Sequence, residues 1–168
     1  LDSNAPGLFN ALNGATVQNV TLENFNIHST SQARVGALAN EITSGTIENV
    51  HIEGGYVSST ASSAKVGGLA GFATSTTINN SSSTTTVDGK NATETGGLVG
   101  LASAETTISN SYSSGDVTNG DYVGGLVGRL YNNSTIINSY ATGEVTSKSD
   151  KSGSGGLVGY LWASDIEN

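Results

Sequence analysis

One stretch of the chain decides the fold: residues 125–145, which read GLVGRLYNNSTIINSYATGEV. The stretch opens on a Gly-Leu-Val-Gly tetrad, carries Ile136 and Asn138 about ten residues later, and closes on Val145. The tetrad recurs at Gly97–Gly100 and Gly156–Gly159. Self-similarity at a nearly constant spacing is the signature of a repeat architecture. The frame of this stretch extends along the whole chain.

The frame has four columns, each occupied by the same kind of residue in successive units. The Leu of the tetrad recurs at separations of 30, 31, 29, 28 and 31 residues, at Leu8, Leu38, Leu69, Leu98, Leu126 and Leu157. A β-branched column follows at Val17, Ile47, Ile78, Ile108, Ile136 and Ile166. An Asn column follows at Asn19, Asn49, Asn80, Asn110, Asn138 and Asn168. The last column is apolar, at Ile27, Val57, Val87, Val117 and Val145. Residues 1–168 are thus one repeat segment, with units that start near 7, 36, 67, 96, 124 and 155.

Three apolar columns in each unit predict an all-β fold, a right-handed parallel β-solenoid (β-helix) of about five and a half ~30-residue turns. No unit carries a helical period with caps. A single unit cannot bury its Leu, Ile and Val, but stacked units place like residues on like, on three short faces per turn. We expect stacked amides of the Asn column to form an inward or corner ladder. Positive φ is expected two residues after each Leu, at Asn10, Asn40, Gly71, Gly100, Gly128 and Gly159.

Composition excludes several classes of function. The formal net charge is −8 with only six Lys or Arg, so a basic nucleic-acid interface is excluded. The chain has no Cys, which removes disulfides, thiolate metal sites and Cys nucleophiles. No apolar run approaches the ~18 residues that membrane insertion needs. The start, Leu1 to Asn4, has neither an initiator Met nor a signal peptide, so we expect a piece cut from a longer chain.

The tetrad followed by Ile-x-Asn-Ser-Tyr-Ala-Thr-Gly-x-Val resembles the GLUG repeat of bacterial surface proteins. The units at 97–117 and 125–145 match almost every position, whereas the first two units carry Asn10 and Asn40 in place of the last Gly. GLUG arrays occur in the N-terminal regions of secreted zinc metalloproteases that cleave immunoglobulin A, and also in large adhesins. The resemblance therefore implies an extracellular protein, secreted or attached to the cell wall. Its expected partners are the rest of a parent protein and a host protein (immunoglobulin A) or a glycan.

No catalytic residue or cofactor is expected in the chain itself. A zinc protease of that kind needs His-Glu-x-x-His, and neither His28 nor His51 stands in such a motif. His51 is expected to be a surface ladder residue. Weak cation candidates are the acidic residues near the end of units four and five, Asp116, Asp121 and Glu144. Solvated acidic side chains that keep the rod soluble are the alternative. A polysaccharide-active enzyme with paired carboxylates is a distant alternative.

Large side chains three residues after the landmark Leu predict a partner surface. That column reads Ala11, Glu41, Phe72, Leu101, Arg129 and Tyr160, and Tyr131 and Trp162 are close in sequence. Exposed apolar patches tend to mark interfaces, so the candidate surface is formed by Phe72, Leu101, Arg129, Tyr160 and Trp162. The alternative is that a loop or the parent protein covers them. The overall prediction is a rigid spacer or substrate-facing scaffold of a metalloprotease, with an adhesin array as the alternative.

The C-terminal turn is expected to be the least stable part of the coil, and either to fray or to pack on another molecule. The start, Leu1 to Pro6, is too short for a capping element, and the last unit carries Leu157, Leu161, Trp162 and Ile166 with no following turn.

Overall fold

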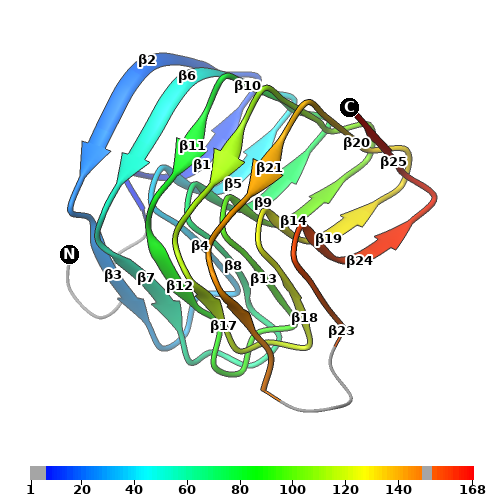
Figure 1. The fold of residues 1–168 in the computed structure, drawn as a ribbon. Helices are drawn as coiled ribbons and strands as arrows, with labels where there is room; N and C mark the ends of the chain where they lie inside the picture. The colour runs from blue at the N-terminus through cyan, green and yellow to red at the C-terminus, as the bar shows by residue number, and fades with distance from the viewer. Residues whose placement is uncertain (1–6, 149–152) are drawn as a thin grey trace.

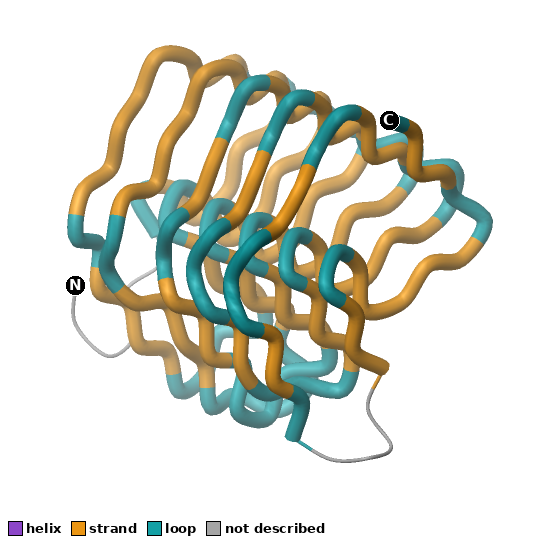
Figure 2. The backbone as a smooth tube through the Cα atoms, viewed as in Figure 1, coloured by secondary structure: helices purple, strands orange, loops and turns teal. Residues whose placement is uncertain are grey.

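The β-branched columns form strands, and each strand pairs in parallel with its counterpart one unit further along the chain (Figure 1). The computed structural model describes residues 7–148 and 153–168, so the start at residues 1–6 lies outside the described part. The chain is a parallel β-solenoid of about five turns, with the N-terminal end at the left of Figure 1 and the C-terminal end at the right. Figure 2 shows strands on every side of the coil and no helix among the described residues.

Four sheets, here named A to D, make up the sides of the coil. Sheet A contains the strands that follow each landmark Leu: β1 (Phe9–Asn13), β5 (Ala39–Thr43), β9 (Ala70–Thr74), β14 (Val99–Ser103), β19 (Val127–Tyr131) and β24 (Val158–Trp162). Sheet C contains the strands of the last apolar column: β3 (Asn26–Ser29), β7 (Tyr56–Ser59), β12 (Thr86–Asp88), β17 (Val117–Thr118) and β22 (Val145–Thr146). Sheet D contains the strands that precede each landmark Leu: β4 (Arg34–Gly36), β8 (Lys65–Gly67), β13 (Glu94–Gly96), β18 (Tyr122–Gly124) and β23 (Gly153–Gly155).

Sheet B is built from long strands at the N-terminal end and from split strands after it. The long strands are β2 (Thr16–Glu23) and β6 (Thr46–Glu53). Later units divide the same path into two short strands: β10 (Thr77–Asn79) and β11 (Ser82–Ser83), β15 (Thr107–Ser109) and β16 (Tyr112–Ser113), β20 (Thr135–Ile137) and β21 (Tyr140–Ala141), and finally β25 (Asp165–Glu167). In these later units Asn80, Asn110 and Asn138 each lie between the two short strands.

The predicted apolar ladders form the core. Leu38, Leu69, Leu98 and Leu126 are fully buried, as are Ile47, Ile78, Ile108 and Ile136 in sheet B. In the terminal turns the same columns open to solvent, because one side of each residue has no neighbouring turn: Leu8 and Ile166 are each 47% exposed. Burial of the ladders is thus complete only where a turn lies on both sides.

The prediction of three faces per turn is wrong, because the structure has a fourth face, sheet D. Sheet D turns an inward column toward the core just before each tetrad, and Val35, Val66, Thr95 and Val123 in it are buried. The strands of sheet D are only three residues long and lie between Gly and turn residues. Such short strands contain too few positions to show an alternation of apolar and polar residues in the sequence.

The expected positive φ two residues after each landmark Leu is also wrong. None of these Gly and Asn residues has positive φ; the column lacks a side chain for a different reason. A Cβ at Gly100 would lie 2.6 Å from the carbonyl oxygen of Gly71 and 2.7 Å from the backbone nitrogen of Val66. Sheet A and sheet D approach so closely there that only hydrogen fits. In the second unit Asn40 occupies this position. Its Oδ1 accepts a hydrogen bond from the Gly7 backbone N–H, and its Nδ2 donates to Asn10 Oδ1.

Positive φ occurs instead at the Asn column, with values between 47° and 57° at Asn19, Asn49, Asn80, Asn110 and Asn138. Asn tolerates this left-handed conformation better than other residues with a Cβ. Hydrogen bonds between side-chain amides link the first turns. Asn49 Nδ2 donates to Asn19 Oδ1 at 2.8 Å, and Asn80 Nδ2 donates to Asn49 Oδ1 at 3.3 Å. The amide ladder thus runs through Asn19, Asn49 and Asn80. It is interrupted at Asn110, whose Nδ2 donates to Asn79 Oδ1 at 2.8 Å and whose side chain is exposed, so the prediction of a ladder along the whole column is wrong there.

The inward polar ladder is formed by the residue that follows the Asn. The backbone N–H of Ser81 donates to the hydroxyl of Ser111 at 3.1 Å, and that of Ser111 donates to Ser139 at 3.1 Å. Each hydroxyl in turn donates to a carbonyl within its own turn, as Ser111 does to Ser109 at 2.7 Å. These hydroxyls satisfy corner N–H groups that the strand pairing leaves without partners.

Candidate functional site

The predicted partner column lies in register on the outward side of sheet A. Parallel pairing aligns Ala11 with Glu41, Glu41 with Phe72, Phe72 with Leu101, Leu101 with Arg129, and Arg129 with Tyr160. Tyr131 aligns with Trp162 in the neighbouring outward column. The structure therefore brings together all five residues of the predicted partner surface.

Sheet D supplies a second outward column that faces this one across the corner. It contains Arg34, Lys65, Glu94 and Tyr122, each four residues before a landmark Leu. We call the two outward columns of sheet A and this column of sheet D the corner face: Phe72, Leu101, Arg129, Tyr160, Tyr131, Trp162, Arg34, Lys65, Glu94 and Tyr122. The sequence carried the signal for the sheet D column in its constant offset from Leu, but the offset was missed because sheet D was not predicted.

Aromatic rings and one guanidinium pack together at the C-terminal end of the corner face. The ring of Tyr131 stacks on Trp162 with centroids 4.7 Å apart, and Tyr122 meets Tyr160 at 4.9 Å. The guanidinium of Arg129 lies between them, 4.6 Å from the Tyr131 centroid and 5.2 Å from that of Tyr160. Cation–π contacts of this kind hold the positive charge of Arg129 against the faces of the aromatic rings.

A buried carboxylate lies beneath this cluster. The side chain of Glu94 is only 3% exposed, with Lys65 Nζ 3.6 Å from Oε2 and Arg129 Nη1 3.6 Å from Oε1. Burial raises the pKa of Glu94, and the positive charges of Lys65 and Arg129 offset only part of that rise. Neither Glu94 Oε2 nor Arg129 Nε has a hydrogen-bond partner.

The N-terminal end of the same corner is hollow. A pocket of about 220 Å³ is lined by Asn10, Ala11, Gln32, Ala33, Arg34, Asn40 and Glu41. The guanidinium of Arg34 donates to Glu41 at 2.7 Å and lies 5.0 Å from the ring centroid of Phe72. Ala11 stands in the column that ends on Tyr160, so this column has a small side chain at the N-terminal end of the coil and a large one at the other end.

A second polar cluster, on sheet C, was missed from the sequence. Asp88 accepts hydrogen bonds from the Tyr56 hydroxyl at 2.7 Å, from Asn119 Nδ2 at 2.8 Å and from the Lys90 backbone N–H at 3.1 Å. Burial raises the pKa of Asp88, but these hydrogen bonds outweigh it and the pKa is lowered overall. Burial and the neighbouring Asp88 raise the pKa of Tyr56 to about 12. The cluster joins three turns, which supports a structural role.

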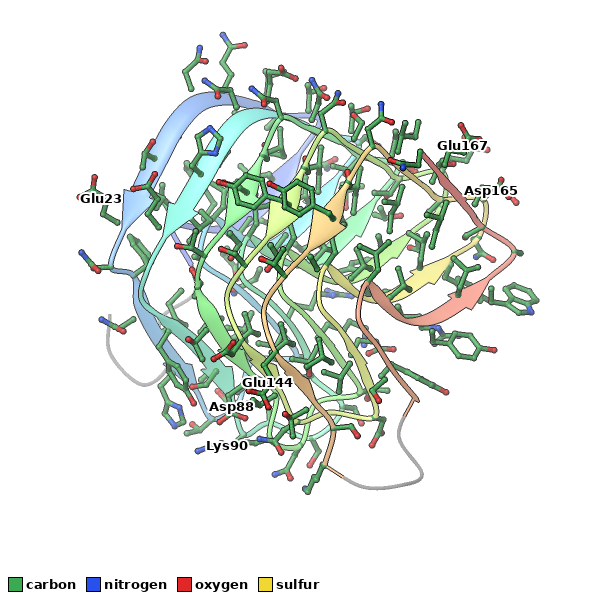
Figure 3. The ribbon with its side chains drawn as sticks, in the orientation of Figure 1. Glu23, Asp88, Lys90, Glu144, Asp165 and Glu167 are labelled. Carbon is green, nitrogen blue, oxygen red and sulfur yellow. The ribbon has the colours of Figure 1, made fainter. Side chains whose placement is uncertain are left out.

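The remaining acidic residues do not gather at one place. Figure 3 shows Glu23 on the N-terminal turn, Glu144 near the sheet C side, and Asp165 and Glu167 on the C-terminal turn. Within residues 7–148 and 153–168, no three His, Asp or Glu side chains are grouped so that they could hold a metal ion. The cation candidates Asp116, Asp121 and Glu144 are exposed; Asp116 accepts a hydrogen bond from the Glu144 backbone N–H at 3.0 Å.

The His residues take part in ladders. His51 bonds to the Ser82 hydroxyl at 2.8 Å and to Asn49 Oδ1 at 2.9 Å, and His28 bonds to the Ser58 hydroxyl at 2.8 Å. His51 is therefore a surface ladder residue, as the sequence predicts. The part of the chain that the structure describes contains no helix long and apolar enough to cross a membrane.

Comparison with known families confirms the predicted resemblance. Residues 2–54 match the N-terminal region of the M26 immunoglobulin-A1-specific metallo-endopeptidases. Residues 91–118 and 119–146 each match the GLUG motif. The two GLUG matches cover the units that carry Glu94, Arg129 and Tyr131 of the corner face.

Individual relatives are long proteins of streptococci. An immunoglobulin A1 protease of Streptococcus sanguinis is 36% identical over 66% of this chain and 8% of its own length. An immunoglobulin A1 protease of Streptococcus pneumoniae strain R6 is 35% identical over 66% of this chain and 7% of its own length. The zinc metalloprotease ZmpC of Streptococcus pneumoniae serotype 4 is 37% identical over 55% of this chain and 5% of its own length. This chain thus spans less than a tenth of these relatives, and no solved structure matches it.

Proposed function

We propose that the chain is a non-catalytic repeat segment of a secreted or cell-wall-attached bacterial zinc metalloprotease of the immunoglobulin A type. Its role there is that of a rigid spacer, or of a scaffold whose corner face meets the substrate. One observation carries the proposal: a match to the N-terminal region of such proteases at residues 2–54 runs into GLUG motifs at 91–146 within a single coil.

The ladders support the rigid role. Each turn is paired in parallel with the next on all four sheets, so bending the coil at any turn would strain hydrogen bonds on several sides at once. The Gly column that packs sheet A against sheet D removes a further degree of freedom, because the two sheets touch through backbone. Such a coil holds its two ends at a set distance and angle.

The second candidate function is an adhesin array that itself binds a host protein or glycan. The corner face favours this alternative, because Tyr160 and Trp162 are 36% and 49% exposed and lie beside Arg129. Aromatic residues and Arg are enriched where proteins bind partners. The two functions are compatible if the corner face is where a protease of this type holds its substrate.

Changing the length of the coil in the longer protein that carries it tests the spacer role. Deleting residues 97–124 joins Gly96 to Gly125 and removes one whole unit while every ladder stays in register. A duplication of the same residues is the matched control, because it lengthens the coil by one unit. Both variants should cleave immunoglobulin A1 more slowly and a short hinge peptide at the unchanged rate, because only the large substrate must span the coil.

Unchanged cleavage of both substrates by both variants would contradict the spacer role. The adhesin role would be supported instead by two results together: the 168-residue chain alone binds immunoglobulin A1 or a host glycan, and the longer protein that carries it has no proteolytic activity.

A further inference from the structure

Two tyrosine rings lie face to face on the outward side of sheet B. Parallel pairing aligns Tyr112 of β16 with Tyr140 of β21, and paired strands of this kind are ~4.8 Å apart. The ring centroids are 5.2 Å apart and the ring planes differ by only 5°. Tyr140 is 54% exposed and Tyr112 is half-buried, so solvent reaches the stack. Two phenols are therefore held side by side where a reagent in solution can reach them.

The composition makes these phenols a target for oxidants. Cys and Met are side chains that oxidants commonly attack, and the chain contains neither. It does contain six Tyr and one Trp. Phenol and indole rings are then the groups that give up a single electron most readily. A one-electron oxidant that meets this chain therefore acts on its aromatic rings.

The reaction open to two neighbouring phenols is coupling to dityrosine. A peroxidase that is supplied with hydrogen peroxide removes one electron and one proton from each phenol. The unpaired electron is shared between the oxygen and the two Cε atoms of the ring. A bond then forms between one Cε atom of each ring, and the hydrogen on each of these carbons moves to the phenol oxygen of its own ring. In the balance, the protein loses two hydrogen atoms and hydrogen peroxide becomes two molecules of water.

Coupling needs the two rings to meet while both are radicals. Side chains that are in register start from neighbouring backbone positions and point to the same side of the sheet. Exposed side chains change rotamer within picoseconds to nanoseconds, so the rings of Tyr112 and Tyr140 can turn from face contact and bring two Cε atoms together. The fold thus replaces a chance encounter of two radicals with a contact that is present from the start.

A second pair of Tyr rings is less suited to coupling. Tyr122 and Tyr160 have centroids 4.9 Å apart, but their planes are tilted by 44°. The guanidinium of Arg129 lies 5.7 Å from the first centroid and 5.2 Å from the second. A positive charge beside a ring opposes the removal of an electron from it, because the ring would then become more positive. The same cation–π contacts hold both rings in place.

The other two Tyr lie beside side chains of other kinds. Tyr56 is aligned with Asn26 on one side and with Thr86 on the other. Tyr131 stacks on Trp162 with centroids 4.7 Å apart. The first pair is therefore the one that the structure favours.

We propose that Tyr112 and Tyr140 form a modification site, at which a one-electron oxidant joins their rings as dityrosine. The co-reactant is an oxidant of the peroxidase class together with hydrogen peroxide. The new bond ties two successive turns together on the outside of sheet B, where short strands otherwise join them by backbone hydrogen bonds. The inference goes beyond the proposed function and does not rest on it, since it concerns a covalent change in the coil itself.

Oxidation of the 168-residue chain with a peroxidase and hydrogen peroxide tests the proposal. The chain is kept dilute, and the monomer is isolated by size exclusion so that links between molecules are left out. The monomer should gain the blue fluorescence of dityrosine and lose the mass of two hydrogen atoms. Trypsin cuts after Arg129 and so places Tyr112 and Tyr140 in different peptides, which should remain joined.

Four Tyr→Phe variants assign the link, and each of them keeps an aromatic ring at its position. Tyr112→Phe and Tyr140→Phe should abolish the joined peptides, because each removes one phenol of the pair. Tyr122→Phe and Tyr131→Phe are the matched controls, because Tyr122 shares a tryptic peptide with Tyr112 and Tyr131 shares one with Tyr140. Both controls should give the joined peptides in the same yield as the original chain.

The link should also stabilise the coil. A covalent bond between two turns restricts the unfolded chain, so the urea midpoint of the oxidised monomer should lie above that of the untreated chain. Tyr140→Phe treated with the same oxidant is the control, and its midpoint should not rise.

The inference is overturned if the oxidised monomer contains no joined peptides, or if the joined peptides persist in Tyr140→Phe. An equal yield of the same link from the chain unfolded in urea would overturn it as well, because the fold would then not be what brings the rings together. Joined peptides without a rise in the urea midpoint would contradict the claim that the link ties the two turns.

Discussion

Ile108→Ala and Ile166→Ala make the same chemical change at two places in one ladder. Ile108 is fully buried in the middle of the coil, in register with Ile78 and Ile136, which are also fully buried. Ile166 occupies the same column in the last turn, is 47% exposed, and has one in-register neighbour, Ile136. The pair therefore separates the effect of stacking from that of residue type.

The expected losses differ by a factor of about three. Ile→Ala removes three carbon groups at about 0.8 kcal/mol each when fully buried, or about 2.4 kcal/mol. At Ile108 a cavity term adds about 1 kcal/mol, because turns paired on both sides cannot collapse into the space. At Ile166 about half of the side chain is already in water and solvent fills the gap, so the loss is about 1 kcal/mol.

Urea unfolding of the 168-residue chain, followed by circular dichroism, measures both losses. The midpoint should fall clearly for Ile108→Ala and slightly for Ile166→Ala, with similar slopes. Equal losses for the two variants would refute the reasoning, since they would mean that the last turn is covered as well as the middle one. A loss below about 1 kcal/mol at Ile108 would refute the rigid ladder itself.

Four further predictions follow from the structure. Asn110→Ala should destabilise the chain by about 1 kcal/mol in urea unfolding while Asn110→Gly is nearly neutral, because φ is 50° there and the side chain is exposed; a larger loss for Gly than for Ala would contradict this. Because the pKa of Glu94 is raised, its carboxyl group stabilises the fold fully below its usual pKa of 4.5, and this contribution is lost as pH rises through the raised pKa. Melting curves should therefore show the original chain losing stability relative to Glu94→Gln as pH rises toward neutral. The effect of Asp88 has the opposite sign: because its pKa is lowered, the carboxylate stabilises the fold above its usual pKa of 3.8, and this contribution is lost on acidification. The melting temperature of Asp88→Asn should therefore fall less steeply than that of the original chain as pH decreases. An equal fall in both would show that the cluster does not hold the carboxylate. Hydrogen exchange should be slower in units three to five than in residues 157–168, where Leu161 is 46% exposed, and uniform protection in a monomer would reveal a cover over the last turn.

The sequence predicts the ladders because they depend on one residue per unit. Leu, Ile and Val recur at nearly equal spacing, and stacking like on like follows from that spacing alone. The partner column was found in the same way, since Phe72 to Tyr160 keep a constant offset from the landmark Leu. Periodic features of the fold and of the candidate site were therefore accessible without a structure.

Features that depend on contact between different columns were not accessible. The Gly at position 100 is required by the backbone of Lys65 and Val66 in the preceding turn, a contact that the column of Gly residues does not reveal, so its role was mistaken for a turn. Glu94 meets Arg129 across a corner between two sheets, and the turn geometry that joins those sheets is not encoded in any single column. Asp88 gains Tyr56 and Asn119 from the turns before and after it, again from different columns.

The direction of the hydrogen bonds between turns has a mechanical consequence. The backbone hydrogen bonds of the four sheets join each strand to the strand stacked on it, so they lie along the coil axis. Force applied sideways loads many of these bonds together, whereas force applied along the axis opens them row by row, beginning at an end. Each turn adds about 4.8 Å to the intact coil but contains about 30 residues, which span roughly 100 Å when extended. When it is pulled from its two ends, the coil should therefore unfold one turn at a time, and each turn should lengthen about twentyfold.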